Sequence, residues 1–130
     1  MLKKPLFKQT FVLLFVIGVA DFFANTLYLY WTVWWFDMVM HFTAGICIGM
    51  ATVLVWQYFF NQEMSIKKAV WTALVFTLAV GLSWEIFELY FELTFFSDGV
   101  AYVTDTSSDL ILDLCGGLLG AIYAHRIVFK

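Results

Sequence analysis

Hydrophobic side chains fill four long stretches of the chain, and short polar segments separate these stretches. Each stretch is about 20 residues long or longer, which is the length that an α-helix needs to cross a bilayer. The pattern therefore predicts an all-α protein, a four-transmembrane-helix bundle in which residues 1–130 form a single integral membrane domain. The expected spans are residues 10–30, 36–60, 65–92 and 107–128.

The composition agrees with a membrane protein and excludes several other classes. Hydrophobic residues make up 63% of the chain and charged residues 13%, whereas a soluble domain has about 45–50% and about 25%. Seven Lys and Arg residues are too few for a nucleic-acid-binding surface, so no nucleic acid partner is expected. Cys47 and Cys115 both lie inside apolar stretches, which indicates small membrane-buried side chains and not a redox pair.

The connections between the stretches differ in length and character. Tyr and Trp residues crowd the first connection, as is typical of a membrane interface. The second connection is a tight hairpin, after which Ser65 is placed to cap the next helix. The third is expected to be the only long loop, and it holds Ser97, Asp98, Gly99 and Asp105.

The basic residues indicate the orientation, because cytoplasmic loops carry the excess of Lys and Arg. All seven fall before the first stretch, in the second connection or at the end of the chain: Lys3, Lys4, Lys8, Lys67, Lys68, Arg126 and Lys130. Four spans place these three segments on one side of the membrane. The sequence therefore predicts that both termini are cytoplasmic.

Acidic residues follow the opposite distribution. Nine of the ten lie outside the basic segments, although an ionisable side chain at membrane depth costs about 2.5–3.5 kcal/mol. With 3.6 residues per turn, most of them share one face of a helix with glycines, which allow helices to approach closely. We therefore expect all four faces to point inward. The faces are Gly18, Asp21 and Asn25; Asp37, His41 and Gly45; Gly81, Glu85, Glu88 and Glu92; and Asp109, Asp113, Gly116 and Gly120.

These faces predict one outward-opening pocket that is rich in carboxylates. At about 1.5 Å per residue, the polar side chains lie roughly 7–10 Å below the outer ends of their spans. The expected pocket residues are His41, Glu85, Glu88, Asp109 and Asp113, with Asp37 and Asp105 at the mouth. No Lys or Arg is expected on that side, so either protons or a cation must supply positive charge. The sequence alone does not choose between them.

The favoured hypothesis is a divalent cation. Carboxylate oxygens and an imidazole nitrogen suit Mg, Mn, Ca or Zn, and the predicted ligands are Asp37, His41, Glu85, Glu88, Asp109 and Asp113. The cation would let the acidic pocket recognise or act on a phosphate-bearing lipid or other envelope substrate. If the protein is an enzyme, metal-dependent hydrolysis is expected, with His41 and Glu85 as the catalytic residues. The simpler alternative hypothesis is that the histidine and the acids have a structural role and only form hydrogen bonds between the helices.

Two other functions remain open. The same acids could serve a proton- or cation-coupled carrier that works as a dimer. Below Asp21, however, the polar residues are chiefly Thr52, Thr72 and Thr77, which favours a site open to one side. Alternatively, the protein could be a non-catalytic partner subunit. Glycine-rich faces could also support a homo-oligomer.

Several short motifs together resemble a known family. They are Asp37-x-x-x-His41-Phe42-x-x-Gly45, Glu85-x-x-Glu88, Asp105-Thr106-x-x-Asp109 and Gly116-Gly117-x-x-Gly120-Ala121. In this order and spacing the chain resembles the YjdF-like small membrane proteins and, more distantly, the VanZ-like family, over spans two to four. The resemblance implies a four-helix membrane core in the bacterial envelope, and therefore a multi-pass protein of the bacterial inner (plasma) membrane.

Overall fold

The computed structural model describes residues 4–93 and 95–129, and every regular element in these residues is a helix. Four helices are long and apolar enough to cross a membrane. The short helix α2 (Leu29–Thr32) and the 3-10 turn η1 (Phe96–Asp98) lie in two of the connections. The predicted all-α fold with four candidate spans is confirmed. The long helices are α1 (Lys4–Thr26), α3 (Phe36–Phe60), α4 (Ile66–Tyr90) and α5 (Val100–Val128).

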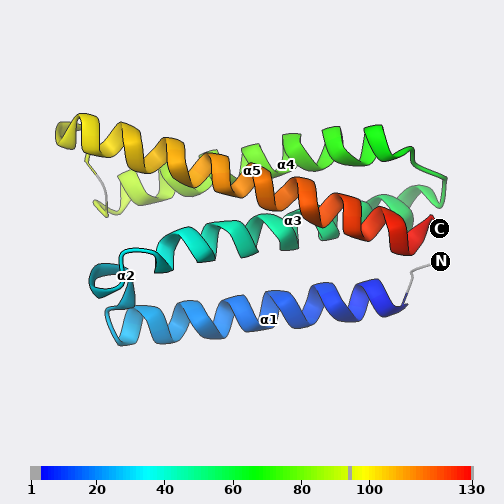
Figure 1. Cartoon of the computed structure of the whole chain (residues 1–130), viewed down its shortest axis with the longest axis horizontal. Coiled ribbons are helices and arrows are strands. Elements are labelled where there is room, and N and C mark those ends of the chain that lie inside the picture. The colour runs from blue at the N-terminus through cyan, green and yellow to red at the C-terminus, as the bar shows by residue number, and fades with distance from the viewer. Residues whose placement is uncertain (1–3, 94, 130) are drawn as a thin grey trace.

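The long helices run alternately up and down, so that both ends of the chain lie at the same end of the molecule (Figure 1). The connection between α3 and α4 lies at this end too, and Lys67 and Lys68 follow it in the first turn of α4. Lys3 and Lys130 lie outside the described residues. The arrangement agrees with basic segments on one side of a membrane, and the assignment of that side to the cytoplasm stays a prediction.

The centre of the molecule is the contact between α3 and α5, and α4 packs against both helices. Glycines make this contact close: a Cβ atom on Gly45 would overlap the backbone carbonyl of Asp113, and one on Gly120 would overlap that of Ile46. Small side chains let backbones approach in a membrane, where packing drives helix association. The glycine-rich faces of α3 and α5 therefore pack against each other within one chain.

Helix α1 lies at the edge and packs mainly on α3. The expectation that its polar face joins the polar faces of the other three long helices is wrong. Gly18 has no atom of another element within 4 Å of a Cβ position, and Asn25 is exposed and donates to the backbone carbonyl of Asp21 (2.9 Å). The Asp21 carboxylate accepts a hydrogen bond from the Tyr30 hydroxyl (2.6 Å). This polar face therefore joins α1 to the following turn.

Two helix boundaries differ from the expected ones because of local backbone geometry. Helix α1 spans Lys4–Thr26, not residues 10–30. It ends before residue 30 because Tyr28 adopts a left-handed conformation (φ 58°) between α1 and α2. Helix α5 begins at Val100, so the second half of the expected long loop is helical. Gly99 precedes it with φ 63° and ψ −120°, a conformation that favours glycine.

The other two long helices agree with the sequence. Helix α3 has the expected bounds, and α4 begins directly after Ser65, whose hydroxyl accepts from the backbone N–H of Lys68 (3.2 Å). The predicted Ser65 cap is confirmed. Cys47 and Cys115 are both free. Large exposed side chains, including Phe11, Phe15 and Phe22, cover α1, as a lipid-facing helix requires.

Candidate metal centre

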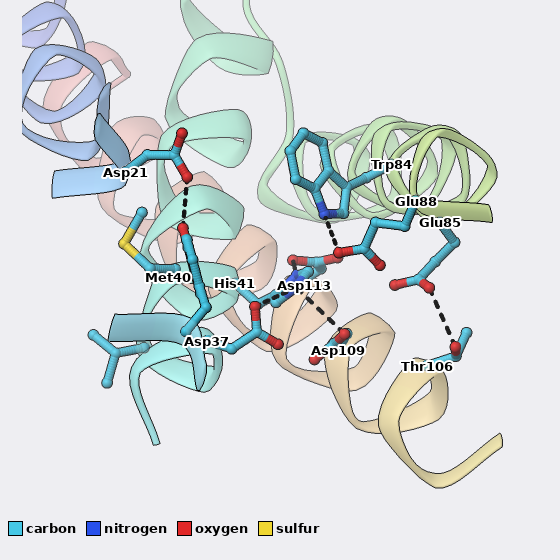
Figure 2. A network of polar contacts seen from close by, with 12 residues as sticks. Asp21, Asp37, Met40, His41, Trp84, Glu85, Glu88, Thr106, Asp109 and Asp113 are labelled. Atoms are coloured by element: carbon cyan, nitrogen blue, oxygen red, sulfur yellow. Dashed lines mark hydrogen bonds and ion pairs between the residues drawn. The ribbon is translucent and has the colours of Figure 1, made fainter. Parts of the chain in front are cut away.

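His41 lies at the centre of a polar cluster between α3 and α5 (Figure 2). Its side chain is 9% exposed. Nδ1 lies 3.0 Å from Oδ1 of Asp113, while Nε2 lies 3.4 Å from Oδ2 of Asp109 and 3.5 Å from Oδ1 of Asp37. Both ring nitrogens therefore face carboxylates, and Nε2 faces two of them.

Helical spacing and close packing together create this arrangement. Asp37 and His41 are four residues apart on α3, and Asp109 and Asp113 are four apart on α5, so that each pair shares one helix face. Gly45, one turn after His41, rests against the backbone of Asp113. The lack of a side chain there allows the two pairs to meet.

Helix α4 adds two glutamates with different surroundings. Glu85 is buried, and its Oε2 accepts a hydrogen bond from the Thr106 hydroxyl of α5 (3.2 Å). Its Oε1 is also buried and has no hydrogen-bond partner among the described residues. Glu88 is half-buried, and its Oε1 accepts from the indole N–H of Trp84 (3.0 Å). Each glutamate is thus held through one oxygen only.

Negative charge predominates in the cluster. Five acids surround the single histidine, and every ion pair among the described residues involves His41. Grouped carboxylates at low dielectric need compensation by protons or by a cation. The residues fit a divalent cation in this respect, and they also supply a suitable mixture of oxygen and nitrogen donors.

The distances between potential ligand atoms fit metal binding as well. One ligand atom from each of Asp37, His41 and Asp109 lies within 4.8 Å of the other two, and the same holds for Glu85, Glu88 and Asp109. Oxygens bound to one ion at about 2.0–2.6 Å are at most roughly 4–5 Å apart. Small side-chain movements would therefore close either group around an ion.

Six of the seven predicted site residues come together: Asp37, His41, Glu85, Glu88, Asp109 and Asp113 (Figure 2). Among His41 and its three aspartate partners, Asp37 has the most exposed side chain, at 39%, as expected for a residue at the mouth of the pocket. Asp105 is exposed on α5 and forms no hydrogen bond or ion pair with a described residue. Its role at the mouth stays a prediction.

An open groove lies beside the cluster. It has a volume of about 560 Å³ and runs between α3 and α5. Most of its surface is apolar, although Thr104, Ser107 and Ser108 are among the residues that line it, and none of the five acids does. The acids are therefore packed between helices, and Asp37 and Glu88 connect the cluster to the surface. The lining residues are Met38, Val103, Thr104, Ser107, Ser108, Ile111 and Leu112.

The sequence reasoning missed three hydrogen-bond donors. Trp84 precedes Glu88 by four residues, so helical spacing could have identified it. Thr106 precedes Asp113 by seven residues, so the two residues lie on the same face of α5, within about 20° of each other around the helix axis. Tyr30 could not be found in this way, because α2 determines its position. Burial and the hydrogen bond to the Asp21 carboxylate raise the pKa of Tyr30 above its ordinary value.

Comparison with known proteins places the chain in one family. The family described as "Predicted membrane protein (DUF2238)" matches residues 3–130. No curated protein and no solved structure matches the chain. The match agrees with a small integral membrane protein, whereas the finer YjdF-like and VanZ-like resemblance stays a prediction. Because the match extends over nearly the whole sequence, the chain belongs to the "Predicted membrane protein (DUF2238)" family.

Proposed function

We propose that this membrane protein binds a divalent cation through Asp37, His41 and Asp109, and that the cation recognises a phosphate-bearing lipid headgroup. One observation supports the proposal most directly: Nε2 of the buried His41 faces two carboxylates while Nδ1 bonds a third. Metal-binding histidines commonly donate their second N–H to a carboxylate, which fixes the tautomer and frees the other nitrogen for the ion. Asp113 is placed for this role.

A cation accounts for the cluster better than protons on the histidine alone. A doubly protonated imidazole carries one positive charge and has two N–H donors. It would satisfy the aspartates around it, but neither glutamate contacts His41 through a hydrogen bond or ion pair. A divalent ion supplies twice the charge and accepts several oxygen ligands.

The charge of the cluster with a bound cation supports a phosphate group as the ligand. An anion would be repelled by five carboxylates, and a bound metal ion reverses the local sign. Asp37 and Glu88 bring the cluster to the surface at the end of the molecule opposite the termini. The adjacent groove is mainly apolar, which suits an acyl chain beside a headgroup. A phosphorylated lipid fits both features, and His41 would act as a ligand and not as a proton carrier.

The carrier alternative has less support. Outside the cluster, Thr10 and Thr77 are the only buried polar residues in the described part of the chain, and each donates to a carbonyl of its own helix (2.8 and 2.6 Å). Glycine contacts close the interface between α3 and α5 below the cluster. A polar path to the opposite end is therefore absent from the described part of the chain.

Metal-dependent stability tests the cation. Purified protein is stripped with a chelator, and its thermal unfolding in detergent is followed with Mg, Mn, Ca or Zn added singly. An ion that binds only the folded state stabilises it by about 2.7 kcal/mol at a hundredfold excess over Kd. We expect His41→Gln to weaken this effect and Glu92→Gln, at an exposed acid on the same end, to retain it in full. Equal responses of both variants would contradict the proposal.

A matched lipid pair tests the phosphate. Short-chain phosphatidate and diacylglycerol of the same chain length are added with the stabilising ion or with chelator. We expect phosphatidate to raise the unfolding temperature only when the ion is present, and diacylglycerol to have no ion-dependent effect. Stabilisation by phosphatidate in chelator would show that the ion is not the headgroup ligand.

A further inference from the structure

We infer that the cluster holds two divalent cations, with the carboxylate of Asp109 bridging them and a phosphate group as their common ligand. This inference rests on the proposed function and extends it, because the cation assigned above needs only Asp37, His41 and Asp109. The second ion belongs to Glu85, Glu88 and Asp109.

Asp109 is the one residue common to the two sets of ligands. It lies within reach of Asp37 and His41 on one side and of Glu85 and Glu88 on the other. The two sides come from different helices, α3 and α4, which both pack against α5. A carboxylate has two oxygens, so Asp109 can bind one ion through each of them. The geometry is that of a bridge between two positions.

Glu85 supplies an independent reason for an ion on the α4 side. The residue is 5% exposed, and its Oε1 is buried without any hydrogen-bond partner among the described residues. An unsatisfied buried carboxylate oxygen is costly, because nothing replaces the water that it loses. His41 does not satisfy it. A cation at this place would.

The remaining contacts orient both glutamates. Thr106 donates to Oε2 of Glu85 at 3.2 Å, and Trp84 donates to Oε1 of Glu88 at 3.0 Å. Each donor fixes one oxygen and leaves the other available. Outer hydrogen bonds of this kind position carboxylate ligands in metal sites. Thr106 and Trp84 are therefore positioning residues of the second site.

Charge also favours two ions over one. A single divalent ion offsets two of the five negative charges of the cluster, whereas two ions offset four. The two sites differ in donor type. The site with His41 suits Mn, Zn or Fe, and the all-oxygen site suits Mg, Mn or Ca. Mn fits both sites and is the probe of choice.

Asp113 stays outside both sets of ligands. Its Oδ1 is engaged by Nδ1 of His41 at 3.0 Å. Its Oδ2 packs against α4, where a Cβ atom on Gly81 would lie 2.8 Å from it. Asp113 therefore orients the imidazole and does not bind an ion.

A pair of ions indicates the substrate class. In two-metal sites the ions lie about 3.5–4 Å apart and bind two oxygens of one phosphoryl group. A terminal phosphate monoester offers such oxygens freely. A phosphodiester headgroup has fewer unsubstituted oxygens, so we expect a phosphomonoester lipid to bind more tightly.

The test is the number of Mn ions bound per chain. Chelator-stripped full-length protein in detergent is titrated with Mn, and bound metal is measured by elemental analysis after equilibrium dialysis. We expect two ions in the wild type and in the control Asp98→Asn, whose exposed acid lies on η1. We expect Glu88→Gln and His41→Gln each to retain one ion. Asp109→Asn should weaken both sites.

The outcomes separate the two proposals. One ion in the wild type, abolished by His41→Gln but retained by Glu88→Gln, would overturn the second site and leave the proposed function intact. No bound ion in a monodisperse wild type would overturn both. Because His41→Gln could fail to fold, Asp37→Asn is measured beside it, and retention of one ion there supports two sites. Loss of all ions in a folded Asp37→Asn would contradict them.

Discussion

The two halves of the contact between α3 and α5 are built in opposite ways. Towards the termini the contact is apolar and close, with Gly49 against the backbone of Gly117 and fully buried Ala121 and Val53 nearby. Towards the other end the same two helices bring His41 and the aspartates together. One half resembles an ordinary membrane helix interface, and the other concentrates charge.

The difference shows which half the fold requires. Close packing of small residues is enough to hold helices together in lipid, and the apolar half provides it. Charged groups at membrane depth cost free energy unless they are compensated. The polar half therefore lowers the stability of the protein when no ligand is bound. Binding of a ligand is the best physical explanation for the presence of these charged residues.

Replacement of His41 by alanine should give the largest loss of stability. Without metal, this change leaves three aspartates facing one another with no positive partner, and breaking a buried ion pair costs about 3–5 kcal/mol. Denaturant unfolding in detergent measures the loss. Adding Asp109→Asn and Asp113→Asn to His41→Ala should restore most of it. A loss below about 1 kcal/mol for His41→Ala would show that the aspartates of the polar half do not depend on His41 for charge compensation.

Gly116→Ala should be the next most damaging change, and it acts through packing. A Cβ atom there would overlap the backbone carbonyl of Phe42 and would lie 2.8 Å from the backbone nitrogen of Ile46. Backbone cannot yield easily, so we expect a loss of about 1–3 kcal/mol. Gly18→Ala is the matched control, with a change within about 0.5 kcal/mol because nothing lies near it. Similar losses for both glycines would refute the close contact.

Asp113→Asn tests whether Asp113 positions the imidazole of His41 and does not bind the ion itself. We expect the affinity of the His41 site for Mn to fall about 10–100-fold, as for outer-shell partners of metal-bound histidines. The Glu85 and Glu88 site should keep its affinity, a result that general unfolding would not give. Direct titration with Mn measures both. Equal weakening of the two sites would count against a specific action on the imidazole.

Tyr30→Phe should have the smallest effect, since it alters the edge of the molecule. Loss of the hydrogen bond to Asp21 should cost about 1 kcal/mol. The pKa of Tyr30 is raised in the folded protein, so its stabilisation is complete below the unfolded value of about 10 and is lost at higher pH. The difference in free energy of unfolding between the wild type and Tyr30→Phe should therefore be constant from about pH 6 to about pH 9. A difference that vanishes in this window would contradict the assignment.

Much of the fold could be predicted because it depends on short-range periodicity. The bounds of α3 and the cap at Ser65 follow from apolar length and local chemistry. The edge position of α1 could not be predicted in this way. Its polar face has the same spacing as the others, but Asp21 accepts its hydrogen bond from Tyr30, which α2 places after the turn at Tyr28.

The same limit applies to the site. Helical spacing places His41, Glu85 and Asp109 on inward faces, but it does not give the rotation of one helix about another. The assignment of Nδ1 to Asp113 and of Nε2 to Asp37 and Asp109 depends on that rotation. The unpartnered Oε1 of Glu85 also depends on tertiary packing.

Anomalous diffraction from crystals grown with Mn tests the central claim most directly. We predict a peak at coordination distance, about 2.0–2.3 Å, from Nε2 of His41 and from an oxygen of Asp109, with a second peak on the Glu85 side of the same carboxylate. The absence of any Mn peak from the cluster, with His41 still between Asp109 and Asp113, would contradict the claim that this half of the molecule is a metal centre.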